Sequence, residues 1–302
     1  MRVVSLFSGA GGLDLGLKMS GHQIVWAVDI DKDSCETYKN NIGDHIICND
    51  ISNVKDIPES DVIVGGFPCQ GFSLANLKRS VNDDRNKLYK EFVRIVKLKS
   101  PYYFIAENVR GILSLDDGKI MKNIINDFTK LGYNVQYKVV NFANYGVPQN
   151  RFRVIIVGSK KTIQKEKYFN YPIETHNKTN WISISEALKD IPEPDFNNVS
   201  LKNHIYSKYK ITNRNFTGHR LTDPNKPSPT ILARGNGKGG VCAIQHPKNH
   251  RRLSVRESAI IQTFPIEFEF FGSMNSMYRQ VGNAVPVHYA YLLGKSLKGL
   301  EA

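Results

Sequence analysis

The stretch of sequence that decides the fold spans residues 2–19 and reads RVVSLFSGAGGLDLGLKM. Residues 2–7 are apolar and β-branched, which is typical of a buried strand. Residues 8–12 include three glycines and predict a tight turn, and residues 13–19 have the apolar spacing of a helix. A strand that runs through a glycine-rich turn directly into a helix predicts the opening of a βαβ unit.

The same alternation of strand and helix patterns continues to about residue 160. Further strands are predicted at residues 24–28, 45–48, 62–64, 102–106, 135–140 and 154–157. Helices are predicted at residues 32–41, 87–99 and 119–131. This order predicts an α/β fold built on a doubly wound, mostly parallel sheet, which binds its ligands at the carboxyl ends of the strands.

The pattern changes after residue 160. Residues 165–250 are rich in Asn, Lys, Pro and Gly, and within them only residues 185–189 have a helical pattern. Helical patterns return at residues 254–262 and 287–298. We therefore expect a first domain made of residues 1–180 and 276–302, and a second, smaller and loop-rich domain at residues 181–275.

Charge is concentrated in the middle of the chain, whose formal net charge is +13. Residues 161–252 carry 16 Lys and Arg against 7 Asp and Glu, whereas residues 1–160 carry 21 against 17. Such a basic region suits a polyanion such as nucleic acid, and a solvated basic face is the alternative.

Other bulk features exclude several classes of protein. No apolar run reaches the roughly 18 residues that a membrane span needs, and the start of the chain is not typical of a signal peptide. The four cysteines are far apart and include no CxxC pair. We therefore expect a cytoplasmic protein without a disulfide framework or a structural metal site.

The glycine turn is a candidate ligand site. Gly9, Gly11 and Gly12 expose backbone N–H groups at the start of a helix, and Asp29 ends the next strand, where it could bind a ribose hydroxyl. Asp14 stands where a GxGxxG loop would have its last glycine. A nucleoside without a pyrophosphate therefore fits better than a dinucleotide, although such a turn can also lack a ligand.

Three further segments contain candidate catalytic residues. Cys69 follows Pro68 at the end of an apolar strand, where an accessible thiol could be a nucleophile or a small buried residue. Glu107 ends the next strand and could be a general acid or the partner of an exposed ion pair. Arg151 and Arg153 point to one side of an extended segment, which suits a phosphate or carboxylate but also describes a surface pair.

Taken together, these segments resemble the C5-cytosine DNA methyltransferase family. The similar motifs, in order, are SLFSGAGG at 5–12, GGFPCQGFS at 65–73, DDRNKLY at 83–89, ENV at 107–109, QNRFR at 149–153, RRLSVRE at 251–257 and QVGNAV at 280–285. Thr230-Ile231 resembles the Thr-Leu dipeptide of the family's target-recognition domain, and only residues 160–225 remain unaligned. Ser5 departs from the family, which usually has Asp there.

The resemblance implies a fold, a reaction and a set of site residues. It implies a Rossmann-like methyltransferase domain that transfers a methyl group from S-adenosylmethionine to carbon 5 of a flipped-out cytosine, with Cys69 as nucleophile and Glu107, Arg151 and Arg153 around the base. The implied donor contacts are Phe7, Gly9, Gly11, Gly12, Asp29, Asp50, Ile51, Pro68, Leu88, Asn283 and Ala284. Candidate DNA contacts, in part from the basic middle region, are Ser73, Arg85, Gln149, Arg214, Arg220, Thr230, Arg234 and Lys238.

The same resemblance implies a set of partners and leaves alternative functions to compare. We expect double-stranded DNA as substrate, a monomer, and a separate restriction endonuclease with the same recognition sequence. A tRNA cytosine is the nearest alternative substrate, because an RNA-modifying branch of the family has the same motifs. A non-catalytic donor-binding protein is disfavoured by the intact Cys69 and Glu107. A zinc-dependent deaminase is excluded because the chain has neither HxE nor PCxxC.

Overall fold

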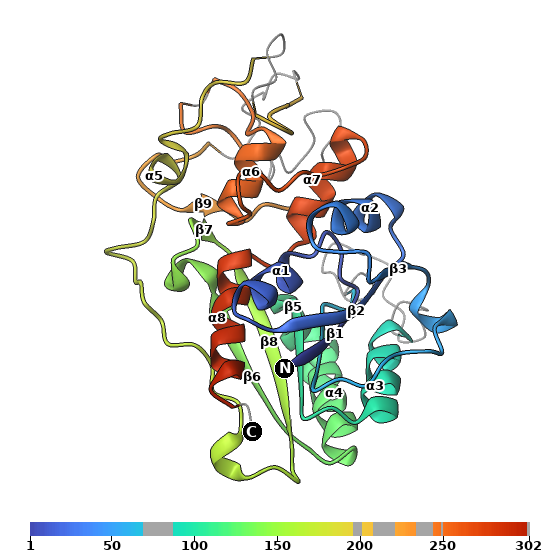
Figure 1. The fold of residues 1–302 in the computed structure, drawn as a ribbon. Coiled ribbons are helices and arrows are strands. Elements are labelled where there is room, and N and C mark those ends of the chain that lie inside the picture. The colour runs from blue at the N-terminus through green and yellow to red at the C-terminus, as the bar shows by residue number, and fades with distance from the viewer. Residues whose placement is uncertain (69–86, 196–200, 208–220, 234–243, 249, 301–302) are drawn as a thin grey trace.

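The computed structural model describes residues 1–68, 87–195, 201–207, 221–233, 244–248 and 250–300 (Figure 1). Cys69 and the predicted DNA contacts Ser73, Arg85, Arg214, Arg220, Arg234 and Lys238 lie outside these ranges.

A seven-stranded sheet organises the first part of the chain. Its strands are β1 (Arg2–Leu6), β2 (Gln23–Asp29), β3 (Ile46–Cys48), β4 (Val62–Gly65), β5 (Tyr103–Val109), β6 (Tyr133–Asn141) and β8 (Phe152–Lys160), in the order β3-β2-β1-β4-β5-β8-β6. The pairs among β1 to β5 are parallel, and β8 runs antiparallel to both β5 and β6. The prediction of a mostly parallel sheet is confirmed.

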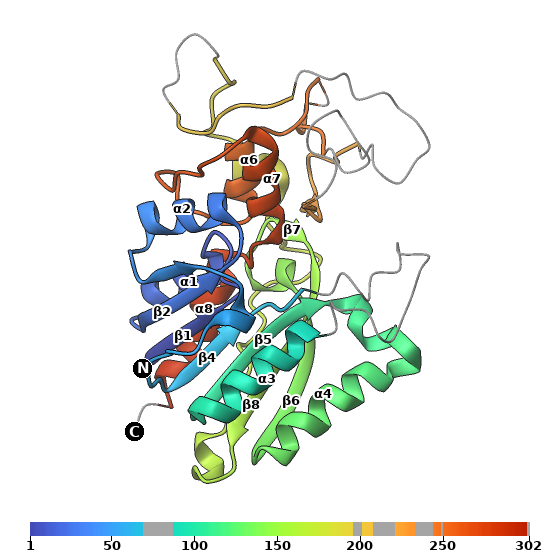
Figure 2. The ribbon, with the colours of Figure 1, turned by 90° about the vertical axis from the view of Figure 1, so that its right-hand side faces the viewer.

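Helices cover both faces of the sheet (Figure 2). α1 (Gly12–Met19) and α8 (Val287–Lys298) pack on one face, and α3 (Lys87–Lys99) and α4 (Lys119–Lys130) pack on the other. Alternate residues of one strand therefore enter different cores: Phe104 packs with α3 and α4, whereas Ile105 packs with α1 and α8. Burial on both faces explains why these strands are continuously apolar.

The chain reverses its direction across the sheet between β1 and β4. β2 and β3 lie to one side of β1, and β4 and β5 lie to the other. At such a reversal the loops after the two central strands separate and leave a crevice at their carboxyl ends. The loops concerned are the glycine turn after β1 and the Phe67-Pro68 segment after β4.

A third buried cluster joins the middle of the chain to the first domain. It includes residues from α2 (Lys32–Asn41), α5 (Ile184–Leu188), α6 (Val255–Ile261) and α7 (Met274–Asn283). Figure 1 shows α6 and α7 together above the carboxyl edge of the sheet, near α2. The sequence pattern did not predict α7, because its buried residues include Ser276, Gln280 and Gly282 beside Tyr278 and Val281, so its buried face is not continuously apolar.

Short elements complete the described chain. They are η1 (Ile51–Asn53), η4 (Arg110–Gly118), η5 (Phe142–Tyr145), η6 (Lys165–Lys167), and the paired strands β7 (Gln149–Asn150) and β9 (Ser228–Pro229). Among the residues with a described placement, no helix is long and apolar enough to cross a membrane.

A buried carboxyl group lies beneath the glycine turn. The Ser5 hydroxyl donates to Oδ1 of Asp14 at 2.7 Å, and the Tyr38 hydroxyl donates to Oδ2 at 2.7 Å. Burial raises the pKa of Asp14 to about 6, although the two hydroxyl groups lower it. An Asp at position 5, the usual family residue, would face Asp14, so the acid at position 14 accounts for the Ser at position 5.

We expect Asp14→Asn to change how stability depends on pH. The folded-state pKa of about 6 exceeds the ordinary value of 3.8, so the native carboxyl group destabilises the fold progressively as pH rises from 3.8 through 6. Relative to wild type, the variant should therefore gain about 2.5 kcal/mol in free energy of unfolding between pH 4 and pH 7.5. Urea denaturation at both pH values measures this, and a difference independent of pH would contradict it.

Candidate active site

The predicted donor contacts from four strands lie at one edge of the sheet. Phe7, Asp29, Asp50 and Pro68 stand at or just beyond the carboxyl ends of β1, β2, β3 and β4. The parallel register sets Leu6 beside both Val28 and Gly65, so these ends are level with one another. The structure thus brings together residues up to 61 positions apart, from Phe7 to Pro68, as the sheet order requires.

The glycine turn has a backbone that few side chains tolerate. Phe7, Gly9 and Gly11 have φ values of 54°, 56° and 87°. A Cβ at Gly9 would meet no atom within 4 Å, so the space beside it is open to a ligand. The strained Phe7 is stabilised by its surroundings, because Ser8 N donates to the carbonyl of Val28 at 3.0 Å.

Asp29 joins this turn to β2. Its Oδ2 accepts the N–H of Gly9 at 2.8 Å and its Oδ1 accepts the N–H of Asp31 at 2.9 Å. Burial raises the pKa of Asp29, and these two N–H groups oppose that rise. Ile30, which follows it, is 67% exposed and offers an apolar surface beside the carboxylate. A carboxylate next to an apolar surface fits a ribose and its base.

The beginning and the end of the chain meet at Gly12. A Cβ there would lie 2.5 Å from the Val285 carbonyl oxygen and 3.2 Å from the Ala284 Cβ, so only glycine allows this approach. Asn283, at the end of α7, is exposed beside this contact. The structure therefore places the predicted donor contacts Asn283 and Ala284 against the glycine turn.

The other predicted donor contacts differ in exposure. Asp50 caps η1, and its Oδ1 accepts the N–H and hydroxyl of Ser52 at 2.8 and 2.7 Å, which lower its pKa. Ile51 is only 4% exposed and belongs to the core, and Leu88 in α3 packs against the same core. The side chains of Ile51 and Leu88 therefore pack mainly against the core and leave little of their surface for a ligand.

An ion pair joins two of the predicted catalytic residues at the edge of the sheet. Nε of Arg153, at the start of β8, lies 2.8 Å from Oε1 of Glu107, near the end of β5, with exposed side-chain fractions of 12% and 13%. Burial lowers the pKa of Arg153, and Glu107 opposes this shift. The antiparallel pairing of Glu107 with Ile155, and of Val109 with Arg153, sets this contact. The structure therefore pairs Glu107 with Arg153, two residues that the family resemblance places around the base.

Arg151 is close to the charges of Glu107 and Arg153, but its guanidinium binds backbone carbonyls. Its guanidinium donates to the carbonyls of Ile231 at 2.8 Å, Gly282 at 3.0 Å and Ala284 at 3.4 Å, and the residue is 1% exposed. Burial and the neighbouring Arg153 lower its pKa, whereas Glu107 raises it. The expectation that Arg151 orients the base directly does not fit this geometry, because its guanidinium donates to backbone carbonyls.

Asn108 supports the segment that leads to Cys69. Its Nδ2 donates to the carbonyl of Phe67 at 3.1 Å, and its Oδ1 accepts the N–H of Val109 at 2.9 Å. The residue is 2% exposed, so these hydrogen bonds are shielded from solvent. Asn108 was not singled out from the sequence, where its only signal is its place beside Glu107.

Gly66 permits Glu107 to approach this segment. A Cβ at Gly66 would lie 3.1 Å from Oε2 of Glu107, closer than an ordinary contact. We expect Gly66→Ala to displace the carboxyl group by a few tenths of an ångström and to lower kcat about ten-fold. Gly111→Ala is the matched control, because its Cβ would meet no atom within 4 Å. Equal rates for the two variants in steady-state methyl transfer would contradict this expectation.

The two predicted DNA contacts with a described placement behave differently. Thr230 is partly exposed, and its hydroxyl donates to the Asn150 carbonyl at 2.9 Å. Gln149 is fully buried: its Nε2 donates to Gln262 Oε1 at 2.7 Å and its Oε1 accepts the N–H of Ile231 at 2.9 Å. The expectation that Gln149 contacts DNA is therefore wrong in this structure, because both ends of its amide bind protein.

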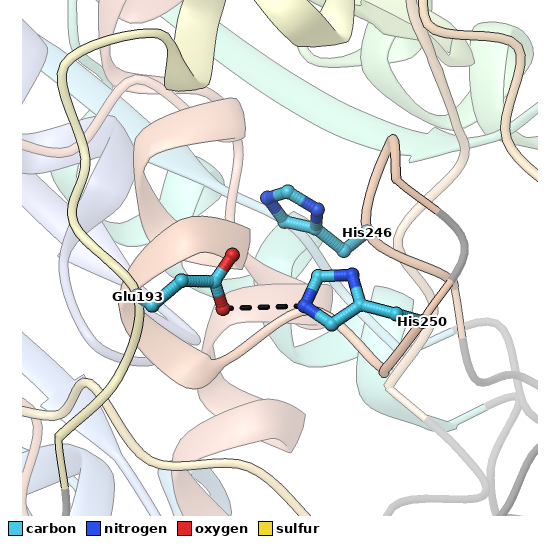
Figure 3. A group of neighbouring side chains, drawn as sticks. All are labelled: Glu193, His246 and His250. Atoms are coloured by element: carbon cyan, nitrogen blue, oxygen red, sulfur yellow. Dashed lines mark hydrogen bonds and ion pairs between the residues drawn. The ribbon is translucent and has the colours of Figure 1, made fainter.

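One group of described side chains has the donors of a metal site (Figure 3). The ligand atoms of Glu193, His246 and His250 lie within 4.8 Å of one another. However, Arg251 Nε donates to Glu193 Oε2 at 2.7 Å, and the N–H of Lys248 donates to His246 Nδ1 at 3.2 Å. Because Glu193 pairs with both Arg251 and His250, the group forms an ion-pair network, and no metal is assigned to it.

The site geometry agrees with the comparison of the whole sequence with known families. The sequence profile described as C-5 cytosine-specific DNA methylase matches residues 1–299. Two relatives are each 38% identical: the type II methyltransferase M.NgoFVII of Neisseria gonorrhoeae, with 98% of this chain and 86% of the relative covered, and the type II methyltransferase M.FnuDI of Fusobacterium nucleatum, with 99% and 94% covered.

Solved structures share the fold. An E. coli prophage protein described as a DNA modification methyltransferase is similar with a TM-score of 0.75 at 24% identity, covering 99% of both chains. The S. pombe Dnmt2 methyltransferase is similar with a TM-score of 0.69 at 19% identity, covering 100% of both. The match over residues 1–299, together with the 38% identity to named methyltransferases, shows that this chain is a member of the C-5 cytosine-specific DNA methylase family.

Proposed function

We propose that the protein methylates carbon 5 of one cytosine within a specific word of double-stranded DNA, with S-adenosylmethionine as the donor. The observation that carries the proposal is the Glu107–Arg153 pair, at 2.8 Å, beside the end of β4 that leads to Cys69. Addition to a cytosine ring requires a nucleophile, for which we propose Cys69, and a partly buried acid, for which we propose Glu107.

The residues at the other strand ends fit the donor. The open space at Gly9 and the Asp29 carboxylate suit the methionine and ribose portions, and exposed Ile30 suits the adenine. Asn283 and Ala284 would close the site against Gly12. When bound there, the donor supplies an electrophilic methyl group. Nucleoside recognition without a pyrophosphate agrees with the departure from GxGxxG.

The protein's own residues carry the chemistry. A cytosine in a duplex hides its ring, so the base must first leave the stack. The Cys69 thiolate then bonds to carbon 6, and electron density moves to carbon 5. Carbon 5 takes the methyl group as the bond from that group to the donor sulfur breaks, which leaves S-adenosylhomocysteine. Glu107 hydrogen-bonds ring N3 and the exocyclic amine, and Arg153 holds the Glu107 carboxyl in place. Loss of the carbon 5 proton, to a water, and of Cys69 restores the ring.

Charge supports these steps. Glu107 is one carboxylate among two buried guanidinium groups, which leaves an excess positive charge at this edge of the sheet. That excess favours a thiolate nearby and stabilises negative charge that develops on the ring.

We assign DNA recognition to residues 181–275 and their basic side chains. The candidates Arg214, Arg220, Arg234 and Lys238, together with Ser73 and Arg85, would hold phosphates and read bases. The relatives named as type II methyltransferases support a role in protecting DNA from a cognate restriction endonuclease. We propose that the protein acts as a monomer in the cytoplasm.

Transfer of a labelled methyl group tests the proposal. The protein is mixed with tritiated S-adenosylmethionine and unmethylated plasmid DNA, with total tRNA in parallel, and labelled DNA is bisulfite-sequenced. Label at one cytosine context of DNA is expected. Label only in tRNA would change the substrate to RNA, and label in neither, with donor binding intact, would overturn the proposal.

A further inference from the structure

The backbone at Ile231 is held from both sides by one short strand segment. Gln149 Oε1 accepts the N–H of Ile231 at 2.9 Å, and Arg151 donates to the Ile231 carbonyl at 2.8 Å. The neighbouring residues add to this contact, because the Thr230 hydroxyl donates to the Asn150 carbonyl at 2.9 Å. The segment around Ile231 is therefore fixed to residues 149–151, immediately before β8.

Gln262, at the C-terminal end of α6, extends this contact. Its Oε1 accepts from Gln149 Nε2 at 2.7 Å, and its Nε2 donates to the carbonyls of Val281 at 2.7 Å and Ala284 at 3.1 Å. Each amide oxygen faces an N–H and each amide nitrogen faces an oxygen, so both amides have one possible orientation. The two amides form a hydrogen-bonded relay. It joins the N–H of Ile231, through Gln149 and Gln262, to the carbonyls of Val281 and Ala284 at the end of α7.

Arg151 reaches the same turn by a second route. Its Nη2 donates to the carbonyls of Gly282 at 3.0 Å and Ala284 at 3.4 Å. Gln149, Arg151 and Gln262 are 0%, 1% and 0% exposed. A buried polar network of this kind is costly when one member is lost, since its partners cannot bind water instead.

We propose that Gln262 is a positioning residue that fixes the DNA-recognition segment around Ile231 in register with the catalytic pair. The path is short: Gln149 and Arg151 bind the Ile231 peptide, and two residues beyond Arg151, Arg153 contacts Glu107. Gln262 holds Gln149 in the orientation that this requires. The inference rests on the proposed function, since it assigns the segment containing Thr230 and Ile231 to target recognition.

Gln262→Leu tests this role. It removes the hydrogen bonds of the Gln262 amide without adding charge. The target base should then no longer be held at the correct position relative to the Glu107 carboxyl group. We expect kcat to fall about 30-fold, because small misplacements are costly to reaction rates. The preference for the recognised duplex over one with a single changed neighbouring base pair should fall about ten-fold. Binding of S-adenosylmethionine should change less than three-fold.

Asn41→Leu is the matched control for stability. Asn41 also holds one backbone residue from both sides: its Nδ2 donates to the Glu269 carbonyl at 2.8 Å and its Oδ1 accepts the Glu269 N–H at 2.9 Å. It lies in α2, and its amide makes no bond to Gln149, Arg151 or Ile231 among the described contacts. Both variants should lower the thermal midpoint, but only Gln262→Leu should lower discrimination between duplexes. Equal discrimination in the two variants would overturn the inference.

Gln262→Glu adds a rescue test. A protonated Glu accepts from Gln149 through one oxygen and donates to Val281 through the other, whereas its carboxylate would face the carbonyls of Val281 and Ala284. Its kcat and discrimination should therefore recover, relative to wild type, as pH falls from 8 to 6. A pH profile parallel to wild type would count against the relay. Absence of DNA methylation by the wild-type protein would instead reject the proposed function.

Discussion

Cys69→Ser is expected to abolish methyl transfer to DNA while S-adenosylmethionine binding remains within about three-fold of wild type. A hydroxyl group at this position ionises far less readily than a thiol, so it cannot add to carbon 6 of the ring. The loss should be at least about 1000-fold in kcat, because the whole reaction depends on that bond. Single-turnover transfer of tritiated methyl groups measures it, and calorimetry measures donor binding.

Two further measurements make the assignment specific. DNA that contains 5-fluorocytosine at the target should become covalently attached to the wild-type protein, because fluorine cannot leave carbon 5 as a proton does, and Cys69→Ser should form no such complex. Cys48→Ser is the control, since Cys48 is an exposed, free cysteine at the end of β3. A Cys69→Ser variant that turns over, or that still becomes attached to the DNA, would remove Cys69 from the mechanism.

The edge of the sheet that carries the site was predictable because it depends on local patterns. Apolar strands separated by helices dictate parallel pairing, and parallel strands end on the same side. The alternation of strands and helices along the chain is therefore enough to bring Phe7, Asp29 and Asp50 to one edge. The Glu107–Arg153 contact was not predicted, because it depends on the antiparallel pairing of β8 with β5, which brings the start of β8 beside the end of β5.

Contacts that depend on distant loops were not predictable. Arg151 binds carbonyls of Ile231 and Gly282, which are 80 and 131 positions away in the sequence. No periodicity indicates that a backbone carbonyl will meet a particular side chain, so Arg151 was interpreted as a base contact and Gln149 as a DNA contact. Their complete burial, and the role of Gln262 between them, depend on how the middle of the chain packs on the first domain.

The division into domains shows the same limit. The composition change near residue 160 is real in the sequence, but α6 and α7 share a buried cluster with α2 of the first domain. Ala10 and Tyr38 from the start of the chain pack in that cluster with Val255 and Phe264. A boundary at residues 181 and 276 therefore stays a prediction about function, with the recognition residues on one side of it.

Glu107→Gln is expected to lower kcat by about 100- to 1000-fold with little loss of DNA affinity. The amide keeps the size of the side chain but cannot hold or transfer a proton at ring N3. It also leaves Arg153 and Arg151 without their shared carboxylate in a buried place. Because the variant removes a negative charge near the DNA, its affinity for duplex should stay equal or increase.

A control variant and the pattern of kinetic constants show whether Glu107→Gln impairs the chemical step or only the fold. Glu59→Gln removes a carboxylate from another ion pair, with Lys99 at 2.9 Å, where the Glu59 side chain is 76% exposed. That variant should keep wild-type kcat, since exposed pairs contribute little. If Glu107→Gln instead weakened DNA binding and left single-turnover kcat unchanged, Glu107 would be a binding residue. A loss confined to kcat places the carboxyl group at the reacting ring, because only an interaction that strengthens in the transition state affects kcat alone.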